Sequence, residues 1–214
     1  IDRAKLDIAQ IEAGVAGAPG VRLSAGTLGV DSLHSFTPTL SARWDARGPA
    51  REVLGFVQAS PLNALTQQAL ARARITGAVQ GEVSLSVPLA DLARTRVTGT
   101  VQLPGNDLQM TPDTPTLARA RGQIVFSETG FAVRNAQARV LGGDLSFEGG
   151  LRPDAQGQAR LLFRGQGSVT AEGLRDPLLG PLARLAGGAS GATTYAAQLG
   201  WRGGAPEWQV ASSL

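Results

Sequence analysis

The chain has 214 residues, a formal net charge of +3 and a hydrophobic content of 43%, which is near the norm for a globular domain and argues against wholesale disorder. Cysteine is absent, which excludes a disulfide framework and thiolate metal sites. Lys5 is the single lysine among 20 basic residues, and the arginines are scattered along the chain, so nucleic-acid binding is not expected.

Residues 1–48 are expected to form the opening strands of a β-sheet. Alternating apolar residues indicate strands at Val21 and Leu23, at Leu28 and Val30, and at Leu40, Ala42 and Trp44. Residues 2–13 are compatible with a strand or a helix, and we favour a strand because the neighbouring segments are strands.

Residues 49–73 break this alternation and predict a helical interlude. Apolar residues follow helical spacing from Val53 to Val57 and again from Leu62 to Leu70. Ser60 and Pro61 divide the stretch, because serine is a good N-cap and proline is accepted at the first helical position. We therefore expect two short consecutive helices.

Residues 74–173 carry the clearest strand signals and predict an antiparallel meander. Apolar and polar residues alternate in two runs, whose apolar positions are Val83, Leu85 and Val87, then Val97, Val101 and Leu103. Turns are predicted at Pro104-Gly105-Asn106, Glu128-Thr129-Gly130, Gly142-Gly143, Arg152-Pro153-Asp154 and Gly165-Gln166-Gly167. Connections this short favour antiparallel neighbours.

A short motif recurs within this meander, in which a glycine is followed at alternate positions by two apolar residues. It begins at Gly81, Gly99, Gly122 and Gly143. A glycine at the head of each apolar run permits a bend or bulge where the sheet must curl.

Residues 174–187 predict a further helix, with Asp176 as N-cap, Pro177 at the first position and Gly187-Gly188 as the end. Residues 188–214 are expected to start the next strands. Both interludes lead into similar small residues, Thr76-Gly77-Ala78 and Ser190-Gly191-Ala192. The chain therefore shows a larger repeat of strand, capped helix and new strand.

These elements predict a mainly β fold: a curved, folded-over antiparallel sheet that forms a groove (a β-taco-like meander), with short helices at its crossovers, in one continuous repetitive domain. The apolar face of such a sheet needs a cover, because exposed apolar patches above roughly a few hundred Å² are uncommon on soluble monomers. The cover is either a second sheet, which closes a core, or a bound lipid. Periodicity alone favours the closed core.

The sequence offers little for catalysis. His34 is the only histidine and lies in a loop sequence without acidic or histidine neighbours, so we interpret it as a surface residue. The carboxylates of Asp107, Asp113, Asp144 and Glu148 are isolated, whereas a glycosidase needs two acids facing one cleft. The glycine-rich sequences lack the lysine of a P-loop or the third glycine of a dinucleotide-binding loop. We expect no enzyme activity, no metal and no cofactor.

The chain begins without methionine inside a patterned segment, and no apolar run is long enough to span a bilayer. We therefore expect it to be an internal piece of a longer protein.

An ordered set of motifs runs through the chain from Ser60 onward: Ser60-Pro61-Leu62, Leu85 to Leu89, Thr95 to Leu108, Leu117 to Gly130, and Leu141-Gly142-Gly143. With these motifs, residues 39–210 resemble YhdP-type proteins of the AsmA-like superfamily, which are related to TamB-like bridge-type lipid transfer proteins. Residues 1–38 match this pattern weakly.

The resemblance implies an open apolar β-groove, and it reverses the preference for a closed core. It implies a periplasmic segment that shields phospholipid acyl chains between the inner and outer membranes, anchored to the inner membrane through a segment outside this chain, with envelope proteins as further partners and no nucleic acid. The alternative is a closed β-domain that acts as an envelope scaffold. From alternation, the expected lipid-binding residues are Val83, Leu85, Val101, Leu103, Ile124, Phe126, Val133, Leu145, Phe147, Leu161 and Phe163.

Overall fold

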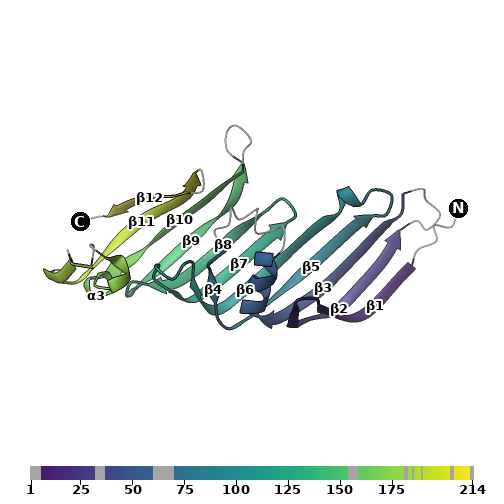
Figure 1. Ribbon diagram of the computed structural model, residues 1–214, viewed down its shortest axis with the longest axis horizontal. Coiled ribbons are helices and arrows are strands. Elements are labelled where there is room, and N and C mark those ends of the chain that lie inside the picture. Colours follow the sequence, from purple (N-terminus) through teal and green to yellow (C-terminus); the bar gives the residue numbers. More distant parts are fainter. Residues whose placement is uncertain are drawn as a thin grey trace.

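A computed structural model describes residues 6–31, 37–59, 70–153, 159–180, 183–184, 186–188, 190–202 and 205–212. The strands of these residues form one open, curved antiparallel sheet of twelve strands, whose order in space follows their order along the chain (Figure 1). The mainly β meander expected from the sequence is therefore confirmed.

The strands are long, and most are joined by tight turns. Their bounds are β1 (Leu6–Val15), β2 (Ala18–Asp31), β3 (Thr39–Pro49), β4 (Arg74–Ile75), β5 (Ala78–Pro88), β6 (Arg96–Gln109), β7 (Leu117–Ser127), β8 (Gly130–Val140), β9 (Gly143–Pro153), β10 (Ala159–Thr170), β11 (Ala192–Arg202) and β12 (Ala205–Ser212). The short β4 pairs with β6 and lies off the main path of the sheet.

The helices are short and lie mostly where the chain leaves the sheet. They are α1 (Ala50–Ala59), α3 (Ala171–Leu174) and the 3-10 turns η1 (Leu92–Arg94), η2 (Pro177–Leu179) and η3 (Ala186–Gly188). The first predicted helix is confirmed by α1, whereas the second, with its Ser60 cap, falls largely outside the described residues. None of the described helices has the length and apolar character needed to cross a membrane.

The single helix predicted over residues 174–187 is wrong. The described part of this stretch forms separate short helical pieces instead, at Leu174 (the end of α3), η2, residues 183–184 and η3, although Asp176 caps η2 as expected, accepting a hydrogen bond from the Leu178 amide at 2.9 Å. Gly180 adopts a positive φ of 56°, which interrupts the helical path early.

Two predicted turns are also wrong. Pro104-Gly105-Asn106 lies inside β6, and Gly165-Gln166-Gly167 lies inside β10. Gly105 has a φ of 142° and marks a register shift between Pro104 and Asn106, so these residues form a bulge that bends a continuing strand. The glycines of β10 serve a packing role described below.

Bulges recur at similar levels of neighbouring strands. Register shifts occur in β7 and β8 close to Arg119 and Asn135, whose φ angles are 52° and 50°. Small side chains fill this region, because Ala120 and Ala136 are 1% and 2% exposed. A bulge increases local twist and bends its strand, so this line of bulges curves the sheet across β6, β7 and β8.

The ends of the antiparallel strands line up along two long sides of the sheet, and these two sides differ in character. We call the edge at which α1 and α3 leave the sheet the helix edge (Figure 1). The opposite edge carries the connection Leu89–Thr95 between β5 and β6 and the turn at Glu128-Thr129, and we call it the loop edge.

The two crossovers at the helix edge are built in the same way. In the first, Pro49 pairs with Ala78, and the Ala50 amide donates to the Gly77 carbonyl at 2.9 Å. In the second, Thr170 pairs with Ala192, and the Ala171 amide donates to the Gly191 carbonyl at 2.9 Å. Gly77 and Gly191 share φ angles of 81° and 87°, which explains why the same glycine recurs before each returning strand.

Asn106 holds the first crossover to the bulge of β6. Its side chain is 2% exposed, and its amide nitrogen donates to the carbonyls of Thr76 at 2.6 Å and Ala78 at 3.0 Å. The backbone is tied at the same place, because the Thr76 amide donates to the Asp107 carbonyl at 3.0 Å. The bulge and the returning strand therefore depend on one buried amide.

Asn106→Ala is expected to lower the free energy of unfolding by about 2–4 kcal/mol, because the carbonyls of Thr76 and Ala78 lose their donor and the buried side chain leaves a gap. Asn106→Asp is expected to be worse at neutral pH, since a carboxylate would face the same two carbonyls. Denaturant unfolding measures both variants. If Asn106→Asp left the chain as stable as the wild type, the amide would not be needed as a donor.

Candidate functional site

One row of side chains crosses the sheet without a polar residue. The paired residues run from β1 to β11 in strand order: Ala13, Leu23, Ala46, Gly81, Val101, Ile124, Val133, Gly149, Phe163 and Leu199. Directly paired residues of antiparallel strands point to the same side of the sheet. At about 4.8 Å per strand the row extends over roughly 40 Å. We call this side the apolar face.

The opposite side is polar at the neighbouring level. The row of paired residues one position away consists of Arg22, Arg47, Gln80, Gln102, Gln123 and Arg134. At this level, from β2 to β8, the two sides of the sheet therefore differ in chemistry, although they belong to one layer of backbone.

The structure brings all eleven predicted lipid-binding residues to the apolar face. Strand pairing links Leu85 with Val97, Val83 with Gly99, and Leu145 with Gly167 on this side. Most of the eleven are half-buried, but Leu103 and Leu161 are 8% and 2% exposed, so protein already covers these two. Their role in binding lipid stays a prediction.

Helix α1 covers part of the apolar face near the helix edge. Ala50, Val79 and Leu103 form a buried cluster, against which Val53, Ile75, Val101 and Ile124 pack. Glu52 fixes the helix to the start of β2, because its carboxylate accepts a hydrogen bond from the Gly20 amide at 2.6 Å. Between β5 and β7, the uncovered apolar surface therefore lies toward the loop edge.

Aromatic side chains on the apolar face stand opposite glycines. Phe126 pairs with Gly99, Phe147 with Gly165, Phe163 with Gly149, and Tyr195 with Gly167. A Cβ added to Gly99 or Gly149 would lie 2.5 Å from the ring of Phe126 or Phe163. The rings of Phe131 and Phe163 also meet, with centroids 6.5 Å apart. The glycines thus leave room for rings to lie across neighbouring strands.

Replacing Gly149 by alanine tests this packing. The new Cβ would press on the Phe163 ring and on the Leu162 carbonyl, so we expect a loss of about 1–3 kcal/mol in the free energy of unfolding. Gly14→Ala is the control, because a Cβ there meets no atom within 4 Å. Equal denaturation midpoints for the two variants would contradict the packing.

Tyr195 is the single tyrosine of the chain, and it lies on the apolar face opposite Gly167. Burial raises the pKa of its phenol above the usual value of 10.0. The neutral form is favoured in the folded state, so the associated stability is present below the unfolded pKa and is lost as pH rises through the folded pKa.

A spectrophotometric titration of tyrosinate absorbance is expected to show a higher pKa in the folded chain than in denaturant. An apolar ligand beside Tyr195 is expected to raise this pKa further, because it removes water from the phenol. A folded-state pKa equal to the denatured one would show that the ring is not desolvated.

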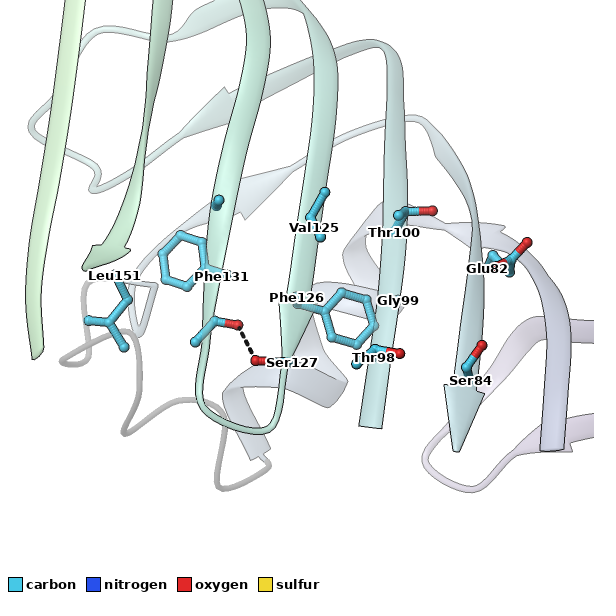
Figure 2. Close-up of a pocket in the computed structure, with 12 residues that line it drawn as sticks. Glu82, Ser84, Thr98, Gly99, Thr100, Val125, Phe126, Ser127, Phe131 and Leu151 are labelled. Carbon is cyan, nitrogen blue, oxygen red and sulfur yellow. Dashed lines mark hydrogen bonds between the residues drawn. The ribbon is translucent and has the colours of Figure 1, made fainter. Parts of the chain in front are cut away.

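A shallow hollow of about 500 Å³ lies near the loop edge, and its lining includes Gly99, Phe126, Phe131 and Leu151 of the apolar face (Figure 2). Two rows of paired residues supply most of its lining: Glu82, Thr100, Val125 and Ala132, then Ser84, Thr98, Ser127 and Gly130. Glu82 forms an ion pair with Arg43 at its side. Hydroxyl groups and apolar side chains line this hollow, and they provide no catalytic arrangement.

The isolated acids considered from the sequence do not come together. Asp113 and Asp144 are strongly exposed and pair with different arginines, Arg72 at 3.7 Å and Arg139 at 3.4 Å. Asp107 accepts a hydrogen bond from the Arg119 amide at 2.9 Å. Among the described residues, no group of histidine and acidic side chains is arranged to hold a metal ion. His34 lies outside the described residues.

The apolar face is larger than the sequence analysis expected. Strand pairing adds residues of β1 to β3 and of β11 that were not among the predicted lipid-binding residues: Leu6, Ile8, Leu28, Val30, Leu40, Ala42, Trp44, Tyr195 and Leu199. The sequence of β2 and β3 shows alternating apolar residues. Alternation alone does not predict on which face of the sheet the apolar side chains of each strand lie.

The family model described as YhdP protein matches residues 3–211. The match therefore includes nearly all of the first 38 residues, where the motifs gave little support. No curated protein and no solved structure matches the chain.

Proposed function

The chain belongs to the YhdP family, and on that premise we propose that it is a segment of a periplasmic, bridge-like lipid transport protein whose apolar face shields phospholipid acyl chains. The observation that carries this proposal is the unbroken apolar row from β1 to β11. We further propose that the protein is anchored to the inner membrane through a segment outside these residues and carries lipid toward the outer membrane.

The energetics favour an acyl chain on this face. Each methylene removed from water contributes about 0.8 kcal/mol. Equivalent apolar positions recur at every strand, roughly 4.8 Å apart, so a chain gains similar contacts wherever it lies along the row. No charged residue interrupts the row, and the head group stays in water beyond the strand ends.

The alternative is a closed β-domain that serves as an envelope scaffold. A closed core needs a second layer over the apolar face. In the described part of the chain, the strands make one open sheet, and the cover observed is the short helix α1 with its buried cluster. This arrangement supports the lipid proposal over the scaffold.

Native mass spectrometry with lipid extraction tests the proposal on the purified chain. We expect phospholipid to co-purify with the wild type and to be lost from the double variant Leu85→Glu and Val97→Glu. These residues are a directly paired, half-buried pair on the apolar face, away from the α1 cluster. Two charges there would oppose an acyl chain, because an unpaired buried carboxylate is strongly unfavourable.

The matched control is Ser84→Glu with Thr98→Glu. Ser84 and Thr98 are the neighbouring pair on the same two strands, but they lie on the polar face. This control adds the same charge to the same strands and is expected to keep its lipid. Folded chains that retain lipid equally in both double variants would refute the proposal.

A further inference from the structure

Burial of the apolar face changes along the length of the strands. Among the described residues, most of the buried apolar side chains of this face lie in the half of their strand nearer the helix edge: Val21, Val79, Leu103, Ala120, Ala136, Ala138 and Val169. Ala42 and Leu161 are buried in the other half. The two ends of the strands therefore offer an apolar ligand different access.

The hairpin of β5 and β6 shows this change step by step. Near the helix edge, Leu103 is buried. Further along the same hairpin, the directly paired Leu85 and Val97 are half-buried. Beyond the strand ends, in the connection at the loop edge, Leu89 and Leu92 are 48% and 65% exposed. Exposure of the apolar side chains thus increases from the helix edge to the loop edge.

Helix α1 is fixed over the helix edge at both of its ends. Near its start, the Glu52 carboxylate accepts a hydrogen bond from the Gly20 amide at 2.6 Å. Near its end, the side-chain amide of Gln58 donates to the Leu70 carbonyl at 2.7 Å. Between these bonds, the helix packs on the buried apolar cluster described above. Polar bonds and apolar packing together hold α1 as a fixed cover on this side of the groove.

The second crossover packs against the same edge six strands away (Figure 1). The Thr170 amide donates to the Leu141 carbonyl at 3.2 Å, in the turn between β8 and β9. Gly173 of α3 lies so close to this turn that an added Cβ would collide with the Leu141 carbonyl. Val169 and Ala171, on either side of Thr170, are buried. The helix edge is therefore covered at both crossovers.

We propose that bound phospholipid is held in one orientation, with its headgroup at the loop edge and its acyl chains directed toward the helix edge. A phosphate beneath α1 would lie among the apolar side chains of the cluster, such as Val53 and Ile75, and burying a charge without a partner is strongly unfavourable. At the loop edge, the headgroup stays in water. This inference rests on the proposed function, because it takes phospholipid as the occupant of the apolar face. Lipids that move along the apolar row then keep their headgroups on one side throughout.

Distances between spin labels test this orientation. The chain contains no cysteine, so one introduced cysteine carries the only label on the protein. Ala93→Cys places it in the connection at the loop edge, and Thr116→Cys places it just before β7 at the helix edge. Both residues are exposed. Because β7 has 11 residues, the two edges are separated by roughly 35 Å along the strands.

The probe is phosphatidylcholine with a nitroxide on its headgroup. We expect this nitroxide to lie closer to position 93 than to position 116. A second lipid, labelled near the end of an acyl chain, reports occupancy of the apolar face whichever way the headgroup points. If the acyl label gives a defined distance and the headgroup label lies equally near both positions, or nearer position 116, the single orientation is wrong and the acyl-chain proposal stands. If neither lipid gives a defined distance, the proposed function fails and the orientation fails with it.

Releasing α1 tests its role as the cover. Glu52→Ala with Gln58→Ala removes the side-chain hydrogen bonds near both ends of the helix, so we expect a second population of headgroups close to position 116. Arg51→Ala is the matched control, because Arg51 is an exposed residue of the same helix, and it is expected to keep the single orientation. Circular dichroism checks that the variants are folded. Unchanged headgroup distances in a folded double variant would show that α1 does not exclude headgroups from the helix edge.

Discussion

The structure depends on strand register more than on any single contact. Side chains alternate between the two faces of a sheet, so a slip of one residue would carry every apolar side chain of a strand to the polar face. Yet ten paired positions from β1 to β11 remain apolar or glycine, while one adjacent row remains polar from β2 to β8. Tight turns preserve this register between most strands, although bulges shift it within β1, β2, β6, β7 and β8.

Glycine determines how the apolar face is shaped. With few aromatic residues in the chain, the rings of Phe126 and Phe163 cover the backbone of neighbouring strands at Gly99 and Gly149. The short glycine motif seen in the sequence thus has two roles. Gly122, with a φ of 152°, belongs to a region of register shift, as expected for a bulge, whereas Gly99 provides space for a ring.

The sequence predicted the alternation, the meander and α1, because these depend on local period and capping. It did not predict that β6 continues through Pro104-Gly105-Asn106, since the same residues form a tight turn in other settings and only the buried bonds of Asn106 hold the strand here. Similarly, Asp176 was recognised as a cap, but the early end at Gly180 was not. The full apolar face depends on the register between neighbouring strands, including the bulges that shift it, and the alternation within a single strand does not specify that register.

The two crossovers are built in the same way, so the strands between them form one structural repeat of defined length. A strand leaves at Pro49 or Thr170, and its partner returns after Gly77 or Gly191 with the same pairing and the same hydrogen bond. Six strands, β5 to β10, lie between these equivalent junctions. Duplication of such a unit would preserve the pairing at each junction and lengthen the sheet by a constant increment. Evolution can thus adjust the span of a protein of this design in discrete steps without altering the cross-section.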